Sequence, residues 1–188
     1  MMRSIVLSVL FLIAVANSPA QEPGFSTQNA MALLTTLAED IGPRPMGSPA
    51  EQRALAFAVS KFKEYGCQES YVIPFTVAGG VNTRSGVAVG VVKGKTGRMI
   101  VIGGHIDSSG PDIPGANDDG SGVACVLAIA RVMGAREHNA TLIFCCWGGE
   151  EMGLHGSEFF VDNFPMLDSV DLMLQIDMAD GSGDPRWP

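Results

Sequence analysis

Residues 99–107 read MIVIGGHID, and residues 141–151 read TLIFCCWGGEE. In each stretch a short apolar run leads through two glycines into a histidine or acidic residues. Continuous apolar runs of this length are typical of strands that are buried on both faces of a sheet. The two stretches therefore predict a central sheet whose strands end in side chains capable of chemistry.

Helical patterns alternate with these strands. Ser26 or Thr27 can cap a helix that stops at Gly42-Pro43, and Ser48, Pro49 and Glu51 form a capping box for a second helix that closes at Gly66. The sequence predicts α/β architecture, as a three-layer αβα sandwich with a mixed, mostly parallel central sheet. The remaining expected elements are strands at 71–77, 86–92 and 171–176 and a helix at 122–133.

Residues 1–20 have the features of a secretory signal peptide. Arg3 precedes an apolar run over residues 5–15, which is about half of the ~20 residues that a membrane-spanning helix needs. Ser18 and Ala20 supply the small residues for cleavage after Ala20, and an uncleaved anchor is the alternative. The sequence therefore predicts a secreted or periplasmic protein with one domain over residues 21–188 and no stable membrane span after cleavage.

The charge of the chain argues against two classes of partner. The formal net charge is −8, and loss of Arg3 with the leader would make it −9. An acidic chain is a poor partner for nucleic acid or for an anionic membrane.

Three of the four cysteines, Cys125, Cys145 and Cys146, are predicted to be buried thiols, with disulfides as the alternative in an exported chain. Cys125 lies in an apolar helical run, and the adjacent Cys145 and Cys146 would face opposite sides of a strand. The spacing CxxC is absent, which disfavours a zinc site built on cysteine.

Acidic residues and a histidine follow three of the expected strands. His105 and Asp107 follow the first, Glu150 and Glu151 the second, and Asp177 the third. In an open α/β sheet, ligands bind outside the carboxyl ends of the strands. Residues 115–122, GANDDGSG, add Asp118 and Asp119 in a glycine-rich loop before a helix. Together these residues predict a metal site.

Hydrolysis with metals needs ligands that leave a coordination position open and a separate carboxylate that takes a proton. Glu150 and Glu151 can divide these roles, because neighbouring side chains point in different directions. Asp107 shares a face with His105 if the strand continues, and can then orient the imidazole. A dinucleotide site and a serine hydrolase elbow are excluded, because Cys125 and Asp119 stand where each needs glycine.

These motifs resemble the zinc exopeptidases of the twenty-eighth metallopeptidase family, which includes leucine-type aminopeptidases and plasma-type glutamate carboxypeptidases. The resemblance covers residues 41–180. It runs through IGPR, GSP, GGHIDSS, PGANDDGSG, GGEEMGLHGSEFF and QIDMAD, in that order.

The resemblance implies two Zn²⁺ ions. His105 and Asp177 would bind one, Glu151 the other, and Asp118 would bridge both. It further implies that Glu150 is the general base, that Asp107 supports His105, and that the peptide between Asp118 and Asp119 is cis.

The chain departs from the family in one respect. The family's second zinc takes a histidine from a loop well after the position of Asp177, whereas the histidines here are at 105, 138 and 155. We therefore expect one zinc site to lack a ligand in this chain, and the domain to be incomplete at its carboxyl end.

The expected function is an exported aminopeptidase that acts on peptides. The alternatives are a carboxypeptidase or dipeptidase of the same family, a glutaminyl cyclase-like enzyme, and a non-catalytic binding domain on the same fold. The sequence gives no prediction of the substrate side chain or the oligomeric state.

Overall fold

The computed structural model describes residues 24–78 and 84–179. The predicted signal peptide, residues 1–20, lies outside these residues. The described chain begins with helices and continues with three consecutive strands, after which helices and strands alternate. In order they are α1 (Thr27–Thr35), a π-helical turn (Thr36–Ile41), α2 (Pro49–Glu64), β1 (Glu69–Thr76), β2 (Arg84–Val92), β3 (Met99–His105), a π-type turn (Ala116–Ser121), α3 (Gly122–Met133), β4 (Thr141–Trp147), α4 (His155–Asn163), a 3₁₀ turn (Leu167–Ser169) and β5 (Val170–Gln175).

The sheet has the strand order β1-β2-β4-β3-β5. Strand β1 pairs antiparallel with β2, and β2 antiparallel with β4. Strand β3 lies parallel to both β4 and β5, with Ile102 opposite Phe144 on one side and Leu174 on the other. The carboxyl ends of β3, β4 and β5 therefore meet at one edge of the sheet.

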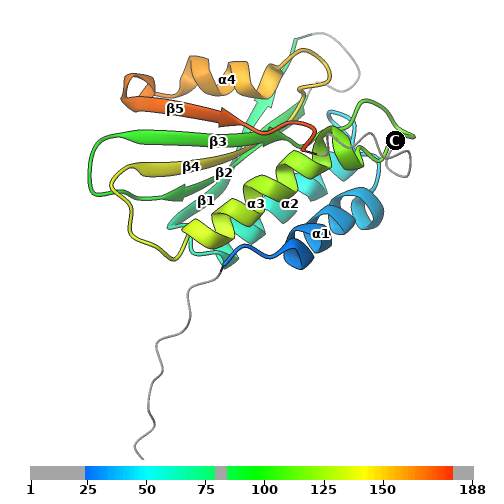
Figure 1. Ribbon diagram of the computed structural model, residues 1–188. Helices are drawn as coiled ribbons and strands as arrows, with labels where there is room; N and C mark the ends of the chain where they lie inside the picture. Colours follow the sequence, from blue (N-terminus) through cyan, green and yellow to red (C-terminus); the bar gives the residue numbers. More distant parts are fainter. Residues whose placement is uncertain (1–23, 79–83, 180–188) are drawn as a thin grey trace, which may run out of the picture.

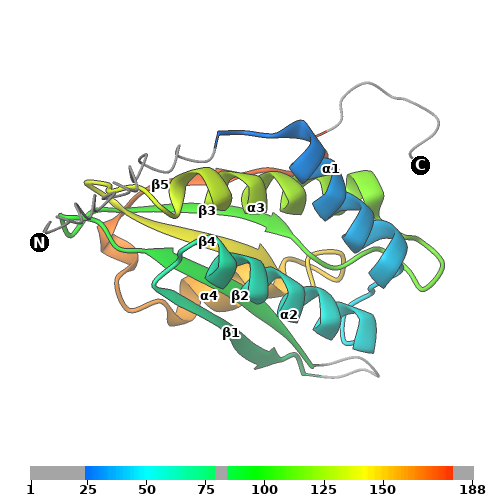
Figure 2. The same ribbon diagram turned by 90° about the horizontal axis from the view of Figure 1, so that it is seen from below.

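Helices cover both faces of this sheet, which confirms the predicted three-layer α/β architecture (Figure 1). Figure 2 shows α1, α2 and α3 together on one face, with α4 on the other. The larger core joins α2 and α3 to the sheet through residues such as Phe62, Leu127 and Phe144. A smaller core packs Phe160 of α4 against Trp147.

Helix α2 approaches the sheet very closely. A Cβ at Gly90 of β2 would lie 2.5 Å from the ring of Phe62, so only glycine leaves room for this ring. Phe62 then stacks on Phe144 with ring centroids 6.0 Å apart. Phe62 therefore lies on the face of α2 that packs against the sheet.

The capping box predicted for α2 is only half formed. Ser48 Oγ accepts a hydrogen bond from the N–H of Glu51, as predicted. The carboxylate of Glu51 does not return to the N–H of Ser48; it accepts from the N–H of Gly47 at 2.7 Å and from the hydroxyl of Ser85 at 2.5 Å. Burial beside β2 gives Glu51 a tertiary partner that a local pattern does not contain.

Two further points differ from or extend the predictions. Helix α4 was not predicted, because its nine residues bury only Gly156 and Phe160 and so show little apolar periodicity. All four cysteines are free thiols. Cys145 and Cys146 are buried as predicted, Cys125 is only half-buried, and Cys67 is buried as well. Within the described residues, no helix is long and apolar enough to cross a membrane.

Candidate metal centre

Three strand ends and one turn bring the predicted site residues together. His105 is the last residue of β3, Glu150 and Glu151 lie just after β4, and Asp177 lies just after β5. Asp118 comes from the π-type turn that precedes α3. Because the three strands are parallel neighbours, a set spread over 73 positions of sequence meets at one sheet edge.

His105 is the centre of this group. Its Nε2 lies 2.9 Å from Asp118 Oδ1, 3.8 Å from Glu150 Oε2 and 3.9 Å from Asp177 Oδ1. The imidazole is 1% exposed, whereas the side chains of Asp118 and Asp177 are 50% and 45% exposed. One side of this group, at His105, is therefore buried, and the other side opens to solvent as the mouth of the site.

Two sets of side chains offer ligand atoms that all lie within 4.8 Å of one another. One is His105, Asp118 and Glu151, and the other is His105, Asp119 and Asp177. The two aspartates differ in how their oxygens are used. Asp119 is buried, and both of its oxygens accept backbone hydrogen bonds, from His105, Gly122 and Met178.

Asp118, by contrast, points its carboxylate toward the imidazole at the open side of the group. The peptide bond between Asp118 and Asp119 is cis, as the family resemblance implied. The two adjacent carboxylates thus have separate surroundings, and Asp118 is the one that is available to a cation.

Asp107 lies beneath the site rather than in its mouth. It is fully buried, and its two oxygens accept hydrogen bonds from the N–H groups of Glu150 and Glu151, at 3.0 and 3.2 Å. Its Oδ1 is 3.6 Å from His105 Nδ1, which is too long for a hydrogen bond, so the attraction between the two is coulombic. Asp107 therefore connects the end of β3 to the turn after β4.

The carboxylates change the protonation of the group. Burial lowers the pKa of the His105 imidazole, but the neighbouring carboxylates, Asp107 foremost, outweigh burial and raise it to about 9. Burial also raises the pKa values of Glu150 and Glu151 above the ordinary range. Without a cation, the site therefore favours protons on groups that a metal would need deprotonated.

The residues present fit zinc. Imidazole nitrogen and carboxylate oxygen are ligands that zinc takes in proteins. Glu151 Oε1 and His105 Nδ1 are buried and have no hydrogen-bond partner within the described residues. A buried carboxylate oxygen without a partner is costly unless a cation satisfies it. His105, Asp118, Glu151 and Asp177 are the residues that could hold metal.

Sequence reasoning missed the supporting roles of Arg44, Glu51 and Asp119. The sequence places Arg44 in a motif without a role, predicts Glu51 as part of a helix cap, and assigns Asp119 no role beside that of Asp118. All three are fully buried charged groups, and burial is the property that a local pattern does not report.

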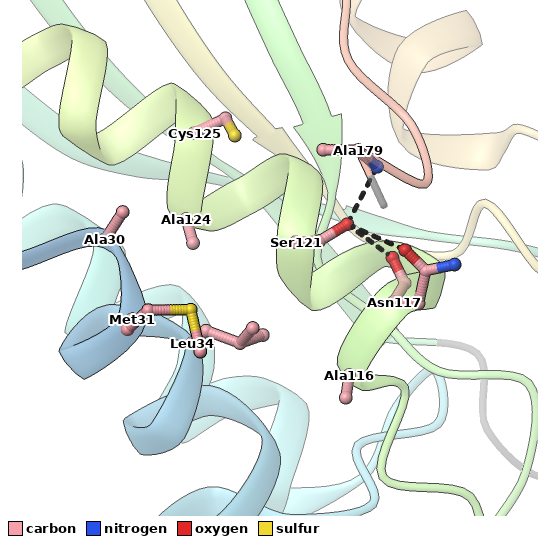
Figure 3. Close-up of a pocket in the computed structure, with 9 residues that line it drawn as sticks. All are labelled: Ala30, Met31, Leu34, Ala116, Asn117, Ser121, Ala124, Cys125 and Ala179. Atoms are coloured by element: carbon pink, nitrogen blue, oxygen red, sulfur yellow. Dashed lines mark hydrogen bonds between the residues drawn. The ribbon is translucent and has the colours of Figure 1, made fainter. Parts of the chain in front are cut away.

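An apolar pocket of about 220 Å³ is lined in part by Ala116, Asn117 and Ser121, which belong to the turn that carries Asp118. Figure 3 shows it between α1, which contributes Met31 and Leu34, and α3, which contributes Cys125. At one end Ser121 Oγ donates to the carbonyl of Asn117 and accepts from the N–H of Ala179 (Figure 3). Among the residues that the structure describes, no charged side chain lines this pocket, so we place the candidate chemistry at the carboxylate group and not at this hollow.

Comparisons with known proteins agree with this geometry. The sequence profile of peptidase family M28 matches residues 88–186, which include the strand ends and turn described above. The chain belongs to this family.

Two of the proteins that resemble this chain are described as aminopeptidases. A probable lipoprotein aminopeptidase, LpqL, of Mycobacterium tuberculosis is 33% identical over 168 residues, which cover 84% of this chain and 33% of that protein. The zinc aminopeptidase BSAP of Bacillus subtilis has a TM-score of 0.76 at 17% identity, over 82% of this chain and 70% of that one. The second shares the fold.

A glutaminyl cyclase of Bacteroides thetaiotaomicron, solved with N-acetylhistamine, also shares the fold, with a TM-score of 0.70 at 19% identity over 86% of this chain and 64% of that one. In three of the curated relatives, the chain spans only 15%, 33% and 30% of the relative's length.

Proposed function

We propose that the whole protein is an exported zinc-dependent exopeptidase, and most specifically an aminopeptidase that uses two zinc ions. The observation that carries the proposal is the meeting of His105, Asp118 and Asp177 with the paired Glu150 and Glu151 at one sheet edge. A probable aminopeptidase with 33% identity over most of this chain favours the same activity.

The ligand roles proposed here are those that the family resemblance implies. His105, Asp118 and Asp177 would hold one zinc, and Asp118 and Glu151 would contribute to holding the other. Bound zinc supplies Lewis-acid chemistry, because it polarises a carbonyl and lowers the pKa of water. Asp119 is not assigned as a ligand, because its two carboxylate oxygens already accept hydrogen bonds from three backbone N–H groups.

Glu150 is the general base in this proposal. Its side chain is 29% exposed and therefore reaches the open mouth of the site, 3.8 Å from His105 Nε2. Burial raises the pKa of Glu150 and so makes its carboxylate a stronger base. Such a carboxylate is better suited to take a proton from water and return it to the leaving amine. Asp107 keeps Glu150 and Glu151 in place through their backbone N–H groups.

Export is the part of the proposal that rests on residues 1–20, read as a signal peptide that leaves the domain of residues 21–188. A secreted or periplasmic enzyme would meet peptides as substrates. A relative that is called a lipoprotein is compatible with such a location for this protein.

Four assays on the purified whole protein test the function. Zinc content should be about two ions per chain, and amino-acid p-nitroanilides should be cleaved. Cleavage of carboxyl-terminal glutamyl peptides alone would replace the aminopeptidase by a carboxypeptidase. Ammonia release from amino-terminal glutamine, without peptide cleavage, would indicate a glutaminyl cyclase. This assay is included because the Bacteroides glutaminyl cyclase shares the fold. Zinc binding without any turnover would indicate a binding domain.

A further inference from the structure

Arg44 is a fully buried arginine in the loop between the first π-helical turn and α2. Its guanidinium makes no direct ion pair within the described residues; it donates to backbone carbonyls instead. Nε donates to Ile106 O at 2.6 Å, Nη2 donates to Gly115 O at 2.8 Å, and Nη1 donates to Pro114 O. A longer bond of 3.5 Å joins Nη1 to Leu37 O.

These acceptors belong to the two segments that carry the candidate ligands. Ile106 stands between His105 and Asp107, directly after β3. Pro114 and Gly115 precede the turn of residues 116–121, which carries Asp118. One rigid planar group therefore joins the end of β3 to the start of that turn.

The backbone of Arg44 adds a second attachment to the same loop. Its N–H donates to Ser108 Oγ at 2.9 Å, and its carbonyl accepts from the N–H of Ser108 at 3.2 Å. The space around the guanidinium is closely filled. A Cβ added at Gly115 or Gly120 would lie 3.4 or 3.3 Å from Nη2. The position of the loop and that of the guanidinium thus determine one another.

Lysine could not make the same set of contacts. Arginine presents five N–H donors in a planar fork, whereas lysine has one compact ammonium on a flexible stem. Burial lowers the pKa of Arg44 to about 10, while the carboxylates of Asp107 and its neighbours oppose this effect, so the side chain stays charged at neutral pH. Its positive charge also lies near carboxylates that repel one another.

We propose that Arg44 is a positioning residue that fixes His105 and Asp118 relative to one another before a cation binds. The expected effect of Arg44 on metal affinity rests on the proposed function. The positioning itself can be measured in the metal-free protein. Arg44 touches neither water nor substrate in this assignment, so it acts only through the backbone of residues 106–115.

The test compares Arg44→Lys with Arg53→Lys in the whole protein. Arg53 is an exposed arginine on α2, so its variant is a matched control for the same chemical change. Amide hydrogen exchange is measured without metal, and zinc affinity by competition with a chelator. We expect Arg44→Lys to speed exchange within residues 106–118 and to weaken zinc binding by about 10-fold to 100-fold, the usual effect of losing a residue that supports a ligand. Arg53→Lys should change neither.

Two results would overturn the proposal. One is unchanged exchange in residues 106–118 of Arg44→Lys. The other is a rise spread evenly over α2, α3 and the sheet, which would indicate a general effect on stability. A wild-type protein that binds no zinc would reject the proposed function, yet faster exchange confined to residues 106–118 would still support the positioning. If Arg44→Lys does not fold, Ser108→Ala removes the acceptor for the Arg44 N–H, together with a long hydrogen bond of 3.5 Å to Gly110 O, and the same local increase in exchange is expected.

Discussion

The backbone N–H of His105 donates a hydrogen bond to Asp119 Oδ2 at 2.9 Å, in the buried base of the site. The other oxygen of Asp119 accepts from the N–H groups of Gly122 and Met178, at 3.0 and 3.1 Å. Asp119 thus joins the end of β3 to the start of α3 and to the segment after β5. Asp118, its neighbour in sequence, is half exposed and points at the imidazole instead.

This division predicts opposite effects for the two aspartates. Asp119→Ala should lower the free energy of unfolding of the metal-free protein by about 3 kcal/mol or more, because three N–H groups lose a buried acceptor. Asp118→Ala should change it by less than about 1 kcal/mol and should abolish tight zinc binding. Urea unfolding in chelator, followed by zinc titration, measures both quantities. Equal destabilisation by the two variants would contradict the division.

Replacing the proposed base should separate chemistry from metal binding. Glu150→Gln should reduce kcat for an amino-acid p-nitroanilide by about 10² to 10⁴, the usual contribution of a general base, with the zinc content unchanged. The exposed Glu158 of α4 provides the control, since Glu158→Gln should have wild-type kcat. Turnover that survives in Glu150→Gln would remove Glu150 from this role.

The turn that carries the two glutamates depends on space at Gly148. A Cβ there would lie 2.5 Å from Glu51 Oε1 and would also meet Ser85 Oγ. Gly148→Ala should therefore lower the free energy of unfolding by about 1 to 3 kcal/mol, as overpacking does in a filled core. It should also weaken zinc binding, because Glu151 follows closely. Gly97→Ala is the control, since no atom lies within 4 Å of the Cβ that it adds. Equal unfolding free energies for the two variants would show that the turn can move aside.

Glu51 should make stability depend on pH. Burial raises the pKa of Glu51 from 4.5 to about 7 in the folded chain. Between these values the folded state holds a proton that the unfolded state has lost, so the free energy of unfolding falls as pH rises from about 4.5 to about 7. The full loss amounts to about 3 kcal/mol.

Glu51→Gln should remove this dependence, because an amide can still accept from Gly47 and donate to Ser85. Unfolding in urea with chelator, at pH 5 and pH 8, gives the comparison. The variant should gain stability relative to the wild type at pH 8 and not at pH 5. The same pH slope in both proteins would show that Glu51 is ionised throughout this range.

Most of the fold follows from local pattern. The helix over residues 122–133 and the strand over residues 141–147 have the bounds that the sequence predicted, because their apolar spacing and flanking glycines are complete within each segment. Helix α4 escaped prediction. It buries only Gly156 and Phe160, so its apolar face is too narrow to stand out in the sequence.

The sequence by itself determined which side chains stand after β3, β4 and β5, and hence that an imidazole and several carboxylates meet at one sheet edge. Only the tertiary structure decided which of those carboxylates are buried and which are open to solvent. Asp107 and Asp119 are buried and accept hydrogen bonds from backbone N–H groups, whereas Asp118, Glu150 and Asp177 are partly exposed. The physical reason is that apolar periodicity is a local property. The partner of a buried charge comes from segments far away in the chain, as the carbonyls of Ile106 and Gly115 do for Arg44.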